Sequence, residues 1–145
     1  MKTVEPDEAQ RLLVKNENVI STPLGLLGFE QVKKYVLLVT PEEEPFLWLQ
    51  MLENPNQGFV VVMPSVVVPN YAPDINPADV EFLGIQAAGD ALVLNIVTVR
   101  NGEATVNLKG PIIINRNTMV GKQCIPTNVT NFALQHPIAP MPVAA

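Results

Sequence analysis

Residues 91–108 read ALVLNIVTVRNGEATVNL, and this stretch decides the fold class. Its first half is rich in β-branched residues, and Asn101-Gly102 is the strongest short-range signal for a hairpin turn. After the turn, Ala104, Val106 and Leu108 alternate with polar residues. A period of two places successive side chains on opposite faces of a strand. The stretch therefore predicts a β-hairpin with one dry face and one wet face.

Short apolar segments continue on both sides of this hairpin, separated by Pro, Gly and Asn. Spacings of about 8–12 residues between such segments are typical of an all-β sandwich or barrel. Heavy use of proline, 14 residues, also argues against a helical bundle. We therefore expect a mainly β, small single-domain β-barrel-like fold with one or two short helical turns. The other predicted strands are Arg11–Lys15, Tyr35–Val39, Phe46–Leu52, Gly58–Met63, Val66–Val68, Ile112–Ile114 and Met119–Ile125.

One short helix is expected after Asn76. Asn76 can cap it, Pro77 suits the first helical position, and Asp79 falls in the first turn, where the helix dipole favours negative charge. Gly84 is expected to end the helix after about two turns. From Pro126 onward the pattern predicts irregular chain.

Charge and cysteine content restrict the partners and the compartment. The formal net charge is −5 over 145 residues, so direct binding to nucleic acid or anionic lipid is not expected. The single cysteine, Cys124, excludes an internal disulfide and is expected to be buried. The N-terminus lacks the apolar core of a signal peptide, and no stretch reads as a membrane helix. We therefore expect a cytoplasmic protein that is a monomer when free.

The sequence offers little for catalysis or for metal binding. A metal site needs several convergent His, Cys, Asp or Glu ligands, and the chain has one His and one Cys. His136 lacks the nucleophile elbow of a hydrolase. The trio Glu42-Glu43-Glu44 is expected to be a solvated turn, and Leu24–Glu30 has two glycines without the Lys-Ser or Lys-Thr pair of a phosphate loop. We expect no enzyme activity, no metal and no cofactor.

The order of several segments resembles one bacterial family. Leu24-Gly25-Leu26-Leu27-Gly28-Phe29-Glu30 precedes the two strands around Tyr35 and Trp48, and Gly58-Phe59-Val60-Val61-Val62 follows. The series continues with Ile96–Val99, Thr105–Asn115, Gly121-Lys122-Gln123 and His136-Pro137. Together these segments, across roughly residues 11–137, resemble the flagellar assembly factor FliW family.

This resemblance implies a cytoplasmic protein without catalysis that binds two proteins in turn. The first is flagellin before export, and the second is CsrA, an RNA-binding translational repressor that the FliW-like protein antagonises. Flagellin translation would thereby be coupled to assembly. The chain departs from the family pattern at three places. Around Ser21 it lacks the Phe-Pro pair that usually precedes the Gly-Phe-Glu turn. Leu27 stands where a proline is common, and Gln135 stands where an arginine is common. These departures leave the corresponding partner contacts open.

Candidate partner-binding residues follow from the matched motifs. We expect Asn70, Tyr71, Asn115, Gln123 and His136 to be exposed and available to partners. The expected domain spans residues 1–137, and residues 138–145 are expected to form a flexible tail. Two other functions stay open: a β-barrel that binds a small ligand, and a generic interaction module that docks through its uncharged C-terminal segment. The predicted strands Phe46–Leu52, Gly58–Met63 and Ala91–Val99 contain no ionisable groups to line a ligand cavity, which favours protein binding.

Overall fold

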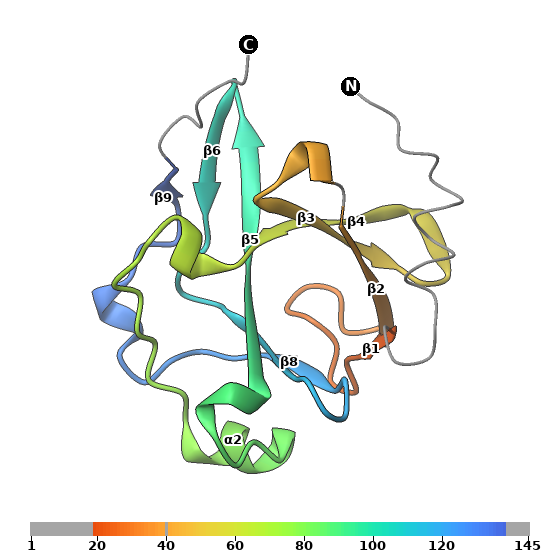
Figure 1. The fold of residues 1–145 in the computed structure, drawn as a ribbon, viewed down its shortest axis with the longest axis vertical. Coiled ribbons are helices and arrows are strands. Elements are labelled where there is room, and N and C mark those ends of the chain that lie inside the picture. Colours follow the sequence, from red (N-terminus) through yellow and green to blue (C-terminus); the bar gives the residue numbers. More distant parts are fainter. Residues whose placement is uncertain (1–18, 40, 139–145) are drawn as a thin grey trace.

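The computed structural model describes residues 19–39 and 41–138, and it confirms the mainly β fold (Figure 1). Between the strands lie the helix α2 (Pro77–Leu83) and the 3-10 turns η2 (Pro41–Glu43), η3 (Pro64–Val66), η4 (Ala88–Asp90) and η5 (Val129–Asn131). Among the described residues, no helix is long and apolar enough to cross a bilayer. The strands are β1 (Val19–Ser21), β2 (Lys34–Val39), β3 (Phe46–Met51), β4 (Asn54–Val62), β5 (Ala91–Arg100), β6 (Glu103–Val106), β7 (Ile112–Asn115), β8 (Gly121–Gln123) and β9 (His136–Pro137).

The sheet curls into a barrel-like shape around the long strand β5. Neighbouring strands are antiparallel in the order β1-β2-β3-β4-β5-β6-β9, and β7 pairs with both β5 and β8. Residues 91–94 of β5 pair with β7, whereas residues 97–100 pair with β6. Figure 1 shows β5 running through the middle of the molecule, with β2, β3 and β4 on one side and β6 and β9 on the other. One strand thus belongs to both parts of the sheet.

Strand β1 and the β7–β8 hairpin meet at Ser21. Its backbone forms an isolated parallel bridge with Val120, and its N–H donates to the carbonyl oxygen of Met119 at 2.9 Å. This contact joins β1 to the β7–β8 hairpin. It therefore completes the ring of strands around the main core.

The main core lies inside this ring and is almost entirely apolar. Its fully buried side chains come from strands across the ring, and burial of each removes apolar surface from water. The buried polar residues of the described chain are Thr22, Gln50, Asn95, Asn115 and Gln123, none of which is ionisable. This composition does not favour a cavity for a charged ligand. The core residues are Ile20, Leu26, Tyr35, Leu49, Met51, Val61, Leu94, Ile112 and Ile114.

Helix α2 forms as the local signals predict. The side-chain oxygen of Asn76 accepts a hydrogen bond from the Ala78 N–H at 2.8 Å, Pro77 begins the helix, and Gly84 ends it. The helix buries Leu83, which packs in a small apolar cluster with Ile113 and Cys124. The Asn76 cap determines the residue at which the helix begins, and the packing of Leu83 on Ile113 holds the helix against β7.

Two segments predicted as strands form turns instead, wholly or in part, because local hydrogen bonds outweigh their β-propensity. At the segment predicted as Val66–Val68, the N–H groups of Val67 and Val68 donate to the carbonyl oxygen of Pro64, at 3.0 and 2.7 Å, and close a 3-10 turn. The predicted strand that contains Ala104, Val106 and Leu108 ends at Val106. There the side-chain oxygen of Asn107 accepts from the N–H groups of Lys109 and Gly110. Asparagine often competes with a ladder in this way.

The predicted hairpin of β2 and β3 and the predicted hairpin of β5 and β6 are confirmed, because the two strands of each pair are antiparallel neighbours. The strand predicted as Met119–Ile125 is shorter, at Gly121–Gln123. Strands β1 and β9 were not predicted, because they have three and two residues and show no measurable period. The predicted strand Arg11–Lys15 and residues 139–145 of the predicted tail lie outside the described residues, while Ile138 donates its N–H to Ala104 at 3.0 Å.

Tyr35 carries a buried hydroxyl that has no hydrogen-bond partner among the described residues. We expect Tyr35→Phe to raise the free energy of unfolding by about 1 kcal/mol at pH 7, because removing an unpaired buried hydroxyl removes a desolvation cost. Burial also raises the pKa of Tyr35 from 10 to about 12. The unfolded chain would release this proton near pH 10 while the folded chain keeps it, so wild-type stability should fall between pH 10 and 12.

Urea unfolding followed by Trp48 fluorescence, at pH 7 and at several values above pH 9, would measure both effects. The Tyr35→Phe variant should lose less stability above pH 10 than the wild type. A variant that is destabilised at pH 7 by more than about 1 kcal/mol would show that the hydroxyl makes a hydrogen bond worth keeping.

Candidate functional site

Asn115 and Gln123 are buried, so the prediction that they are exposed is wrong. They are 3% and 8% exposed. Asn115 lies at the end of β7, where its Oδ1 accepts from the N–H groups of Asn117 and Thr118 at 2.8 and 3.3 Å. Its Nδ2 donates to the carbonyl oxygen of Leu83 at 2.8 Å. This side chain holds the β7–β8 turn against the end of α2, which explains its burial.

Gln123 connects two segments that are far apart in the sequence. Its Nε2 donates to the carbonyl oxygen of Gly110 at 2.9 Å, and its Oε1 accepts from the backbone N–H of Leu27 at 2.9 Å. Buried polar groups need such partners. Any effect of Gln123 on a partner is therefore expected to pass through the segment around Leu27.

The other three predicted residues lie at another part of the surface. Asn70 is exposed, while Tyr71 and His136 are half-buried. The Tyr71 hydroxyl donates to the carbonyl oxygen of Leu108 at 2.7 Å, and its ring packs edge-on against Phe132 with centroids 4.9 Å apart. His136 pairs through its backbone with Val106 in β6. The structure thus brings Tyr71 and His136 to one apolar cluster, the first through its ring and the second through its backbone pairing with Val106.

Exposed apolar side chains lie on the segment 22–32, which Gln123 contacts and which we call the apolar loop. Leu24, Leu27 and Phe29 are 53%, 57% and 42% exposed. The sequence pattern predicted only tight turns here, and Gly25 and Gly28 indeed have φ of +72° and +86°. A usable signal was present, because large apolar residues between turn glycines cannot all face a core. Clustered exposed apolar side chains are typical of protein-interaction surfaces.

The apolar loop is held in one conformation by contacts on several sides. Leu26 is 1% exposed and inserts into the main core. The Thr22 hydroxyl donates to the carbonyl oxygen of Val32 at 3.0 Å across the base of the loop. Phe29 packs edge-on against Phe59 of β4 with ring centroids 5.0 Å apart. With the Gln123 hydrogen bond, these contacts present Leu24 and Leu27 on a preorganised surface, which lowers the entropic cost of binding.

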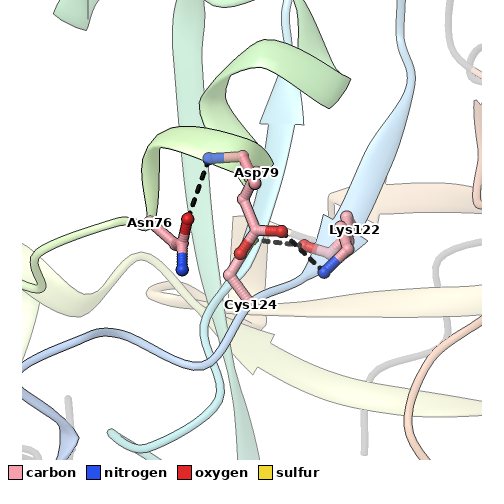
Figure 2. Close-up of polar contacts among 5 residues, drawn as sticks. Asn76, Asp79, Lys122 and Cys124 are labelled. Carbon is pink, nitrogen blue, oxygen red and sulfur yellow. Dashed lines mark hydrogen bonds and ion pairs between the residues drawn. The ribbon is translucent and has the colours of Figure 1, made fainter.

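Cys124 is buried, as predicted, and its surroundings do not favour nucleophilic chemistry. Figure 2 shows Asp79, Lys122 and Cys124 grouped where α2 meets β8. Asp79 and Lys122 form an ion pair of 2.8 Å. Burial and the Asp79 carboxylate raise the pKa of the Cys124 thiol from 9 to about 12. A reactive cysteine needs the opposite shift, so this group serves to join α2 to β8.

Among residues 19–39 and 41–138, no group of three His, Cys, Asp or Glu side chains is placed to hold a metal ion. The acidic trio Glu42-Glu43-Glu44 is exposed at the β2–β3 connection, as expected for a solvated turn. Within the described chain, the apolar loop combines exposed apolar side chains with hydrogen bonds that hold its shape.

Comparisons with known proteins point to one family. The family model described as FliW protein matches residues 3–138. A flagellar assembly factor FliW of Leptospira interrogans is 40% identical over 121 residues, which cover 81% of each chain. That of Bacillus subtilis is 34% identical over 127 residues, covering 86% of this chain and 88% of the relative. A crystal structure of the flagellar assembly factor FliW matches with a TM-score of 0.80 and 34% identity, covering 90% of this chain and 92% of the other.

Proposed function

This chain belongs to the FliW family of flagellar assembly factors, and we propose that it works in the cytoplasm by binding flagellin and CsrA in turn. Flagellin would be held before export. After flagellin leaves, the freed protein would bind CsrA and relieve repression of flagellin translation. No catalytic step is part of this proposal.

The observation that carries the proposal is the apolar loop. Leu24 and Leu27 are more than half exposed on a loop that Leu26, Gln123 and Thr22 hold in place. A rigid apolar surface of this kind binds a protein segment by burying side chains, and it needs no cofactor. Gln123 would then contribute by positioning Leu27.

The residues around Tyr71 are proposed to form a second contact region. Asn70 is exposed beside Tyr71, and His136 pairs through its backbone with Val106, a member of the apolar cluster that Tyr71 packs against. Two separate regions would suit a protein with two partners. Asn115 is assigned a positioning role, because its side-chain hydrogen bonds hold the β7–β8 turn and join it to the end of α2.

Titration calorimetry with purified flagellin monomer and purified CsrA tests the proposal. We expect wild-type protein to bind both, and the double variant Leu24→Ser and Leu27→Ser to bind at least one of them more than tenfold more weakly. Each serine removes apolar contact area, worth about 1.5–3 kcal/mol per side chain when fully buried. The matched control is Val99→Ser, which is 62% exposed in β5 and lies outside the loop.

Equal thermal unfolding temperatures of the variants and the wild type would show that the fold is intact. If the wild-type chain bound neither flagellin nor CsrA, the proposed function would be wrong. If both partners bound the double variant as tightly as the wild type, the apolar loop would lose its role.

A further inference from the structure

A hollow of about 500 Å³ lies next to the apolar loop, between the start of β2 and the β3–β4 turn. Phe29, Val32 and Leu52 supply apolar parts of its lining, and Lys33 and Lys34 supply cations. A second hollow of about 400 Å³ shares Lys34 and Leu52 with the first and adds Arg116. The two hollows are neighbours with Lys34 and Leu52 in both linings, and we call them together the basic groove.

The charge of the basic groove is opposite to that of the whole chain. The chain has nine Lys and Arg against 14 Asp and Glu, yet three cations and one carboxylate, Glu53, line the groove. Within the described residues, the ion pair found is Lys122–Asp79, away from the groove. Lys33 donates to the carbonyl oxygen of Pro23 at 3.1 Å. Backbone hydrogen bonds from Gly28 and Glu30 lower the pKa of Glu30, and the charge of Lys33 adds to this shift. Lys34 and Arg116 are exposed, so their charges are available to a partner.

We propose that the basic groove binds a protein segment in which carboxylate side chains flank apolar ones. The apolar lining would take the apolar side chains, and Lys34 and Arg116 would pair with the carboxylates. Elsewhere the acidic surface would repel such a segment, so complementarity would direct it to the basic groove and set its register. Phe29 belongs both to the apolar loop and to the groove lining, so a single segment could contact both.

A single-stranded nucleic acid fits these observations less well. Nucleic-acid grooves combine cations with several aromatic side chains on which bases stack. In this groove Phe29 is the aromatic residue of the lining, and it already packs edge-on against Phe59. The inference rests on the proposed role in binding flagellin and CsrA, since one of them would supply the acidic segment.

The experiment uses 15N-labelled full chain titrated with flagellin monomer, with CsrA and with a single-stranded RNA oligonucleotide. For one of the two proteins we expect amide shifts concentrated at Lys33, Lys34, Leu52 and Arg116. The double variant Lys34→Glu and Arg116→Glu should weaken that binding at least tenfold at low salt, and by less at high salt, where charges are screened. Lys34→Arg with Arg116→Lys should retain binding.

Arg100→Glu is the matched control, because Arg100 is an exposed cation at the end of β5, outside the groove. Protein binding that survives the double charge reversal, or that shifts only other residues, would overturn the basic groove and leave the proposed function standing. RNA-induced shifts at Lys34 and Arg116 without protein-induced ones would also overturn it. If neither protein bound the wild type, both the groove and the proposed function would be wrong.

Discussion

Gly25→Ala is expected to lower the free energy of unfolding by roughly 3 kcal/mol and to abolish binding that depends on the apolar loop. Gly25 has φ of +72°, a left-handed conformation that costs a residue with a side chain roughly 1–2 kcal/mol. An added Cβ would also lie 2.3 Å from Cα of Glu30. That neighbour is backbone and cannot turn aside, so the overlap adds an overpacking cost of about 1–3 kcal/mol.

Gly28→Ala is the matched control in the same loop. Gly28 has φ of +86°, but an added Cβ would meet nothing within 4 Å. This variant should therefore lose only about 1–2 kcal/mol, the torsional part of the cost. Chemical unfolding of both variants, with titration of flagellin and CsrA, separates the two contributions. Equal losses in the two variants would show that the loop relaxes around Gly25 and that the overlap has no effect.

Leu94→Ala is expected to lower the free energy of unfolding by about 3 kcal/mol, within the range for large-to-small changes in a core. Leu94 is fully buried in β5, at the point where this strand leaves its pairing with β7. Truncation would leave a cavity between the two parts of the sheet that β5 joins. Urea denaturation at pH 7 gives the value directly.

Val99→Ala, on the same strand, is the control for Leu94→Ala. Val99 is 62% exposed, so its truncation should cost less than about 1 kcal/mol, mainly through lower β-propensity. A loss of similar size at Leu94 and Val99 would mean that the core closes around the missing side chain. It would contradict the role of Leu94 as a fixed contact between the two parts of the sheet.

The elements that the sequence predicted correctly are those whose signals are local. Asn101-Gly102 fixes the turn between β5 and β6, and Asn76 with Pro77 fixes the start of α2, because each acts on its own backbone. β1 and β9 could not be predicted in this way. Each exists because a distant strand supplies its hydrogen bonds, β2 for β1 and β6 for β9.

The candidate site shows the same limit. From the sequence alone, Asn115 and Gln123 look like exposed polar residues. Their hydrogen-bond partners are the backbone groups of Leu83, Gly110 and Leu27, and only the fold reveals these contacts. The apolar loop was readable in part, since its glycines predicted turns. The basic groove could not be predicted from the sequence, because Lys34 and Arg116 are 82 positions apart. They line the same hollow only because β1 lies against the β7–β8 hairpin.

The outer strands of the sheet are short, which limits how far the sheet can pair with another molecule. Within the described sheet, β9 offers two residues, one of them Pro137, which has no N–H to donate, and β8 offers three. The Ser21–Val120 bridge occupies part of β1. Long free edges are what allow sheets to extend from one molecule into the next. The outer strands β1, β8 and β9 therefore leave little backbone with which a second copy of this chain could pair.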